Sequence, residues 1–296
     1  MTHKAMDIWV GIDGSETSDN ALIWAARFPH DPSVTTIRPV MSWSFPTFSS
    51  VTATVLPPAD SMHAATAAAA ADVFRRVEPF APDGVAIAEP IVMQGEAAQV
   101  LVDLAEPEDV IVVGSRGLGG FKGLLLGSVS SRLAAKTHCP LVIVPPDHSP
   151  LAPVAGRVVV GVEFTDESKA AVLWAAKTNP DAELELVHAW SIPAISGFEG
   201  GYFGSEDFEK AAVDGLAYLV GEIHDEITNP ARLRSVVVRN DPRRALLEQA
   251  KDADLLVVGA QRHHRAGRVF LGSVAQNVVH HLKVPTVVVP SAAKAE

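Results

Sequence analysis

Two glycine-framed segments carry the residues of this chain that are best suited to bind phosphate. The first, GSRGLGGFKGLLLGSVSS, spans residues 114–131, and the second, GAQRHHRAGRVFLGSVAQ, spans residues 259–276. Each follows a short β-branched run and ends in Gly-Ser-Val, where a helix is expected to begin. A strand, a glycine loop and a helix N-terminus commonly bind phosphate, because backbone N–H groups point outward and the helix dipole favours an anion.

The first loop differs from two common nucleotide motifs. It lacks the Gly-Lys-Ser/Thr of a Walker A motif. A dinucleotide fingerprint follows the first strand, whereas Gly117-Leu-Gly119 follows the fourth expected strand, and Lys122 occupies the position of the last glycine. The spacing that is present is Gly114, two residues, Gly117, nine residues, and then Gly127 and Ser128.

The chain repeats itself once along its length. The first-half sequences VGID (10–13), ALIWAA (21–26) and PLVIVP (140–145) recur as VGVE (160–163), AVLWAA (171–176) and PTVVVP (285–290). Two long copies indicate a tandem duplication of one domain, whereas a solenoid would need more and shorter units. We therefore expect domains at residues 1–148 and 156–296, joined by a Pro-rich segment.

Within each copy, short apolar segments alternate with helical ones. Strands are expected at residues 8–12, 34–41, 85–93, 110–113, 141–144, 158–162, 183–189, 235–239, 255–258 and 286–289. Helices are expected from the hydroxyl caps at 15–17 to residue 26, and at 59–77, 97–105, 128–136, 206–227, 243–250 and 273–281. This alternation predicts an α/β fold of two tandem doubly wound domains, each a five-stranded parallel sheet flanked by helices. In such sheets ligands bind beyond the strand C-termini, where Asp13 and Gly114 can share one cleft.

The opening VGIDGS, the glycine spacing and the closing CPLVIVP and VPTVVVP strands together resemble the universal stress protein family, in its tandem two-domain, ATP-binding branch. The resemblance covers nearly the whole chain. It implies an adenine nucleotide alpha-hydrolase-like fold, with ATP held between the first and fourth strands of the first domain. Mg²⁺ is expected to bridge the phosphates, although no pair of protein ligands for it is evident.

The resemblance also implies which residues bind the cofactor. Asp13 is expected beside the adenosine moiety, and the end of the second strand, around Met41 and Ser42, is expected to line the adenine pocket. Gly114 and Gly117 are expected to let the backbone approach the ribose and phosphates. Asp13 and Ser128 could instead serve only as helix caps, and Arg116 could be a solvated loop charge. The implied sets are Gly11, Ile12, Asp13, Met41, Gly114, Ser115, Arg116, Gly117, Gly127, Ser128, Val129 and Ser130 in the first domain, and Gly161, Glu163, Gly259, Gly272 and Ser273 in the second.

The second copy departs from the first at positions that matter for phosphate binding. Glu163 replaces Asp13, Arg262 replaces Gly117, and Ala275 replaces Ser130. Arg262 is expected to lack the positive-φ freedom of glycine and to fill space near the phosphates. The favoured hypothesis is that ATP binding in the second domain is weakened or altered. The alternative is that the cations gained by the loop, Arg262, Arg265 and Arg268, still hold an anion.

Three classes of function remain open on these residues. The leading hypothesis is an ATP-binding protein with a stress-response or regulatory role, in which nucleotide occupancy sets the conformation of the loops for an unknown protein partner. The alternatives are a slow ATPase or nucleotide hydrolase and a structural dimer module without nucleotide. No Ser/His/Asp or Cys/His constellation is evident, so no catalytic residue is assigned. No metal site is assigned either, because the adjacent histidine pairs do not face one another on a helix.

The composition of the chain argues against two classes of binding partner. The net charge of −11, without basic runs, argues against nucleic acid and against anionic membrane surfaces. No apolar run approaches the roughly 20 residues of a membrane span. The single cysteine, Cys139, fits a reducing compartment, so a cytoplasmic protein, with a homodimer as its expected assembly, is predicted. The segment GFEGGYFGS, residues 197–205, is expected to be a mobile loop, and no role is assigned to it.

Overall fold

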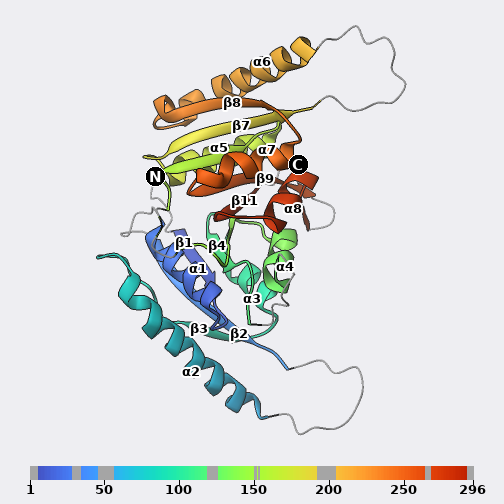
Figure 1. Cartoon of the computed structure of the whole chain (residues 1–296). Helices are drawn as coiled ribbons and strands as arrows, with labels where there is room; N and C mark the ends of the chain where they lie inside the picture. Colours follow the sequence, from blue (N-terminus) through green and yellow to red (C-terminus); the bar gives the residue numbers. More distant parts are fainter. Residues whose placement is uncertain are drawn as a thin grey trace, which may run out of the picture. The chain divides into compact units, whose positions relative to one another are not determined.

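The computed structural model describes residues 6–28, 35–45, 57–118, 126–149, 152, 154–191, 205–263 and 268–291, and only the backbone of residues 205, 261–263 and 268–270. The chain divides into two compact units, Met1–Leu151 and Ala152–Glu296. Each unit contains a parallel sheet of five strands with helices on both faces (Figure 1). The predicted fold of two tandem doubly wound α/β domains is therefore confirmed. Residues 197–204 of the predicted mobile loop 197–205 lie outside the described residues, as do Gly119, Gly120, Lys122 and Arg265 of the two glycine-framed loops.

The sheet of the first unit has the order β3-β2-β1-β4-β5, and all of its pairings are parallel. Its strands are β1 (Met6–Gly11), β2 (Thr35–Trp43), β3 (Ile91–Gln94), β4 (Val110–Gly114) and β5 (Leu141–Val144). The strand order reverses between β1 and β4. The connections that follow these two strands leave toward opposite faces of the sheet, which opens a crevice at their carboxyl ends.

Two helices cover each face of this sheet. Helices α1 (Glu16–Arg27) and α2 (Ala59–Val77) lie on one face, and α3 (Ala97–Leu104) and α4 (Ser128–Lys136) lie on the other. Helix α1 begins at the predicted cap, where the Ser15 side chain accepts a hydrogen bond from the Ser18 amide. Its apolar stripe, which includes Trp24, is buried and contacts β4 and β5, and the small alanines in the stripe allow the helix to approach the sheet closely.

The third strand is shorter than predicted. It spans Ile91–Gln94, and the preceding residues touch β2 only through a bridge between Ile37 and Ile87. Two features shorten the ladder: the Val85 amide turns back to the Pro82 carbonyl, and Pro90 has no N–H to donate. The prediction of a continuous strand over 85–93 is therefore wrong.

The second unit repeats this plan with the order β11-β9-β6-β7-β8. Its parallel strands are β6 (Arg157–Gly161), β7 (Glu183–Trp190), β8 (Leu233–Arg239), β9 (Leu255–His263) and β11 (Thr286–Pro290). Helices α5 (Asp166–Thr178) and α6 (Ser205–Ile223) cover one face, and α7 (Pro242–Gln249) and α8 (Ser273–His280) cover the other. Helix α6 ends earlier than predicted, because a 3₁₀ turn, His224–Glu226, follows it.

The two units differ most after the fourth strand of each repeat. Strand β9 runs on to His263, five residues past the predicted end, and pairs with the antiparallel strand β10 (Arg268–Phe270). Arg262 lies opposite Val269 in this hairpin. The strand predicted to end at residue 258 is therefore longer, and part of the segment predicted as a glycine-framed loop is a β-hairpin in the second domain. Gln261 and Arg262 stand where the first loop has Arg116 and Gly117. Glycine is depleted in strands, so a residue with a side chain at position 262 favours an extended backbone more than Gly117 does.

Cys139 lies in a buried position just before β5, with Sγ 3.4 Å from the Thr137 hydroxyl. Burial raises the pKa of its thiol to about 11. The thiolate is the reactive species, so we expect no labelling by a disulfide reagent such as DTNB in the folded protein near neutral pH. Unfolding in guanidinium should release one reactive thiol per chain. Stoichiometric labelling of the native protein would contradict this prediction.

Candidate functional site

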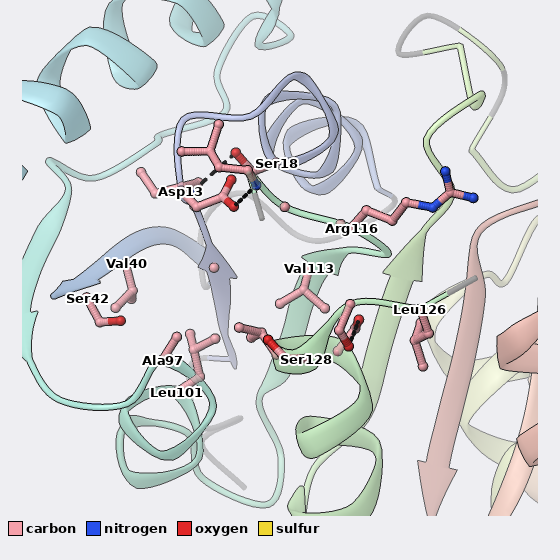
Figure 2. A pocket seen from close by; sticks show the side chains of 18 residues that line it. Asp13, Ser18, Val40, Ser42, Ala97, Leu101, Val113, Arg116, Leu126 and Ser128 are labelled. Carbon is pink, nitrogen blue, oxygen red and sulfur yellow. Dashed lines mark hydrogen bonds between the residues drawn. The ribbon is translucent and has the colours of Figure 1, made fainter. Parts of the chain in front are cut away.

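A cavity of about 270 Å³ lies where the strand order of the first unit reverses, at the carboxyl ends of β1 and β4. It is bounded by the turns that follow these strands, the end of β2 and the first turns of α3 and α4. Figure 2 shows the side chains around it. The lining residues are Gly11, Ile12, Asp13, Ser18, Val40, Ser42, Ala97, Leu101, Val113, Gly114, Arg116, Gly117, Leu118, Leu126, Gly127, Ser128, Val129 and Ser130.

One end of the cavity is mainly apolar. Val40 and Ser42 of β2 line it together with Ala97 and Leu101 of α3 (Figure 2). Met41, which was predicted to lie here, is buried and does not line the cavity. The reason is the period of two in a strand: Val40 and Ser42 share one face of the sheet, and the residue between them points to the other.

Asp13 organises the opposite side of the cavity. Its Oδ1 accepts hydrogen bonds from the Ser15 amide at 3.0 Å and the Ser15 hydroxyl at 2.6 Å, and its Oδ2 accepts one from the Leu118 amide at 2.9 Å. Ser15 is the N-cap of α1, so the reading of Asp13 as only a helix cap does not hold. The carboxylate instead joins the turn after β1 to the loop after β4.

The glycines of the first loop serve close packing. A Cβ atom on Gly117 would lie 2.1 Å from Asp13 Oδ2, and a Cβ atom on Gly114 would lie 2.7 Å from Thr17 Cγ2 and 2.9 Å from the Thr17 carbonyl oxygen. Neither residue has a positive φ, which among the described residues occurs only at Gly14, Gly84 and Gly95. The expectation that Arg262 fails for lack of positive-φ freedom is therefore wrong, because the constraint on Gly117 is space for the Asp13 carboxylate.

The start of α4 faces the cavity. Gly127 occupies the N-cap position, and its amide donates to the Ser115 carbonyl at 2.7 Å. Ser128 is the first residue of the helix and is exposed, so it is not the N-cap. The Ser130 hydroxyl is buried and donates to the carbonyls of Ser115 and Gly127, both at 3.1 Å. The three amides of residues 128–130 have no intrahelical acceptor, because they belong to the first turn.

Two other predicted residues have contrasting positions. Arg116 lines the cavity, and in Figure 2 its side chain extends on the side opposite Ser42. Its Nε atom is buried and has no hydrogen-bond partner among the described residues. Ser115 is fully buried and does not line the cavity, although its carbonyl fixes the start of α4. Its contribution is therefore made through the backbone.

An ion pair connects the two helices that border the cavity. Glu96 caps α3, accepting hydrogen bonds from the amides of Ala98 and Gln99, and its Oε1 lies 2.9 Å from Arg132 Nη1 of α4. Burial alone would raise the pKa of Glu96, but the hydrogen bonds from Arg132 and the two amides together hold it below its usual range.

We expect Glu96→Gln to lower the free energy of unfolding at neutral pH by less than about 1 kcal/mol, because both partners are partly exposed. A carboxyl with a depressed folded pKa stabilises above its unfolded pKa, and this contribution is lost as pH falls through the folded value. The difference between wild type and variant should therefore disappear in acid. Urea titrations at neutral pH and near pH 3 measure it, and a difference that persists in acid would contradict the assignment.

An equivalent cavity of about 260 Å³ lies in the second unit, between β6 and β9. All five residues predicted for this domain line it: Gly161, Glu163, Gly259, Gly272 and Ser273. Its other lining residues are Val162, Thr165, Glu167, Ser168, Val187, Ala189, Pro242, Leu246, Val258, Val274 and Ala275. A Cβ atom on Gly259 would lie 2.6 Å from the Glu167 carbonyl oxygen, which repeats the packing of Gly114 on Thr17.

Sequence reasoning missed several lining residues of the first cavity. Ser18, Val40, Ala97, Leu101, Val113, Leu118 and Leu126 were not assigned to the site. Two signals could have found some of them: the alternation of β2, which pairs Val40 with Ser42, and the amphipathic start of α3, which places Ala97 and Leu101 on one face. No sequence pattern marked Ser18 as a lining residue. Its hydroxyl accepts a hydrogen bond from the Asp13 amide and donates one to the Ser15 carbonyl, and these contacts form only in the folded domain.

Two doubly wound α/β domains, each with a cavity where its strand order reverses and a helix N-terminus facing that cavity, define the structural class of the protein. The chain belongs to the universal stress protein family, whose model matches residues 5–145 and again residues 155–290. The recognition of a tandem member of this family from sequence is therefore confirmed. Within the described residues, no helix combines the length and the apolar character that crossing a membrane requires.

Similar proteins come from mycobacteria and archaea. Universal stress protein Rv2623 of Mycobacterium tuberculosis is 31% identical over 200 residues, which cover 67% of this chain and 66% of that protein. Universal stress protein Rv1996 of the same organism is 30% identical over 207 residues, 67% of this chain and 63% of that protein. The chain thus spans slightly less than two thirds of the length of these curated relatives.

A solved structure extends the likeness in fold to nearly the whole chain. The crystal structure of a universal stress protein from Archaeoglobus fulgidus covers 98% of this chain and all of its own, with a TM-score of 0.67 and 18% sequence identity. At that identity the likeness shows the fold alone.

Proposed function

We propose that the first domain of this universal stress protein binds ATP in its cavity and that nucleotide occupancy serves a stress-response or regulatory role. The single observation that carries the proposal is convergence: the apolar end near Leu101, the Asp13 carboxylate and the first turn of α4 meet in one cavity. The apolar end matches the base of a nucleotide, the Asp13 carboxylate matches its ribose, and the helix N-terminus matches its phosphates.

The chemistry of each part supports this placement. Val40, Ala97 and Leu101 offer an apolar surface on which a base can be removed from water. Asp13 is an exposed carboxylate that can accept a hydrogen bond from a ribose hydroxyl. The amides at residues 128–130 and the Ser128 hydroxyl are donors for phosphate oxygens, and the positive end of the helix dipole favours their charge.

Mg²⁺ would accompany the phosphates as part of the ligand. The described lining of the first cavity contains one carboxylate, Asp13, which is already engaged by Ser15 and Leu118. Binding through phosphate oxygens and water is the usual mode for this ion, so the residues present fit a metal carried by the nucleotide.

We propose binding without rapid turnover, in a cytoplasmic homodimer whose nucleotide state is read by a partner protein. Slow hydrolysis of ATP and a nucleotide-free structural module remain the alternatives. Among the described lining residues, no histidine lies in the first cavity, and the hydroxyl of Ser130 is committed to two carbonyls. A nucleophile paired with a general base is therefore missing from this described lining.

Analysis of co-purified nucleotide tests the function directly. The chain should be purified without added nucleotide, denatured, and its released small molecules identified by chromatography and mass spectrometry. We expect ATP, at up to about one tightly held molecule per chain if the second pocket is weakened or altered. ADP with steady phosphate release would favour the hydrolase. An empty protein that also fails to bind added ATP in calorimetry would contradict the proposal.

A further inference from the structure

We propose that the two pockets of this chain select ligands of different charge. The second pocket takes an adenine nucleoside or nucleoside monophosphate and discriminates against free triphosphate, which the first pocket accepts. This inference rests on the proposed function, because it assumes that both pockets receive an adenosine moiety. The duplication allows the two linings to be compared position by position.

The apolar ends of the two pockets are nearly the same. Val187 and Ala189 stand in the second where Val40 and Ser42 stand in the first, and Leu246 replaces Leu101. Even the packing beneath them is repeated: a Cβ atom on Gly161 would lie 2.8 Å from Leu246 Cδ1, and one on Gly11 would lie 2.9 Å from Leu101 Cδ1. The part of the cavity that would hold a base is therefore preserved.

The carboxylates of Asp13 and Glu163 differ in their hydrogen bonding. In the first, three hydrogen bonds from Ser15 and Leu118 compensate the charge of Asp13. In the second, the Glu163 carboxylate has no hydrogen-bond partner among the described residues, and the Glu163 amide donates to Ser168 Oγ at 2.8 Å. Glu167, which takes the place of Thr17, adds a second acidic residue to the lining. The lining of the second pocket thus includes two acidic residues, whereas that of the first includes one, whose charge is already compensated.

The described lining of the second pocket contributes no positive side chain to balance this negative charge. Arg116 lines the first pocket, whereas the described lining residues of the second include no Lys, Arg or His. The N-termini of α4 and α8 each contribute roughly half a positive charge. That is enough to favour a single phosphate group but smaller than the charge of two carboxylates. Each further phosphate would be repelled at close range, so selectivity should fall steeply as the ligand gains charge.

Two occluding variants isolate the pockets in the full-length chain. Ala97 and Pro242 are the first residues of α3 and α7, and each lines its own pocket. Ala97→Trp should fill the first pocket and leave the second open, and Pro242→Trp should do the reverse. Affinities for adenosine, AMP and ATP are then measured by calorimetry in EDTA, with circular dichroism confirming the fold of each variant.

The expected results differ between the variants. Pro242→Trp should bind ATP at least as tightly as adenosine, whereas Ala97→Trp should bind adenosine or AMP at least about tenfold more tightly than ATP. Adding Glu163→Gln to Ala97→Trp should narrow that ratio several-fold. Glu209→Gln, on the exposed face of α6 and outside the lining, should leave it unchanged. If a Trp variant fails to fold, titration of the wild-type chain gives the same answer: the second ATP should bind at least about tenfold more weakly than the first, whereas two adenosines should bind with similar affinity.

Three outcomes would overturn the inference. One is that Ala97→Trp binds ATP as tightly as adenosine and loses it on Arg262→Ala, because the hairpin cations would then hold the phosphates. Another is that the wild-type chain saturates with two ATP of equal affinity. The third is that Ala97→Trp binds no adenine ligand while Pro242→Trp still binds ATP, which leaves the proposed function intact. Failure of wild type and both variants to bind any of the three ligands would instead contradict the proposed function itself.

Discussion

Gly117→Arg is expected to weaken ATP binding by the first domain about 100-fold. The smallest side-chain atom at this position, Cβ, would lie 2.1 Å from Asp13 Oδ2, so the carboxylate has to move. Its hydrogen bond from the Leu118 amide is then lost, and a hydrogen bond to a charged group contributes roughly 1.5–3 kcal/mol. The arginine side chain also occupies the cavity. Calorimetric titration of the Pro242→Trp background with ATP measures the change at this pocket alone.

Two companion variants separate this mechanism from general damage. Gly221→Ala in α6, where a Cβ meets nothing within 4 Å, should leave ATP affinity unchanged. Gly117→Ala should weaken ATP binding less than Gly117→Arg. The loss of stability caused by Gly117→Ala should be smaller in an Asp13→Ala background, because that variant lacks the carboxylate with which the new Cβ atom clashes. Unchanged affinity in Gly117→Arg would show that the contact between Asp13 and Leu118 is irrelevant to the ligand.

Gly259→Ala is expected to destabilise the second domain by about 2–3 kcal/mol, the range for overpacking a rigid contact. The new Cβ would lie 2.6 Å from the Glu167 carbonyl oxygen and 2.8 Å from its carbonyl carbon. Both are backbone atoms of the first turn of α5, so no side-chain rotation can relieve the clash, and α5 must shift away from β9. Chemical denaturation followed by tryptophan fluorescence measures the loss.

The control again comes from a glycine with free space. Gly221→Ala should keep or raise stability, because alanine is favoured over glycine inside a helix by up to about 1 kcal/mol. Gly259→Ser should resemble Gly259→Ala, since both add the same Cβ. A Gly259→Ala protein as stable as wild type would mean that α5 is not held against β9 as closely as these distances require.

Much of the fold followed from local sequence. The helices Ala59–Val77 and Ser128–Lys136 and the strand Leu141–Val144 have the predicted bounds. The first is a long alanine-rich run, the second follows the glycine at 127, and the third is a short, mainly β-branched run after a proline. The predicted strand bounds were wrong where pairing between strands decides which residues are in the sheet. The β9–β10 hairpin depends on two segments finding each other, and the short β3 depends on how little of the stretch from Val85 onward can pair with β2.

The candidate site divides in the same way. Asp13, Gly114 and Gly127 were predictable because the carboxyl ends of parallel strands and the helix starts must gather at one edge of the sheet. The role of Asp13 as the acceptor for Leu118 was not predictable. Nor was the position of Met41, because a strand's period of two places alternate side chains on opposite faces, and only the packed sheet shows which face borders the cavity.

The residues alone fixed the duplication, the α/β class, the family and the two glycine frames, because these depend on periodicity and spacing along the chain. The sequence did not explain why a residue without a side chain is needed at Gly114, Gly117 and Gly259. In the folded protein, Gly114 and Gly259 admit the first turn of a helix, and Gly117 admits a carboxylate. These are contacts between segments roughly 100 residues apart, and a distance between such segments is set by how the whole domain packs.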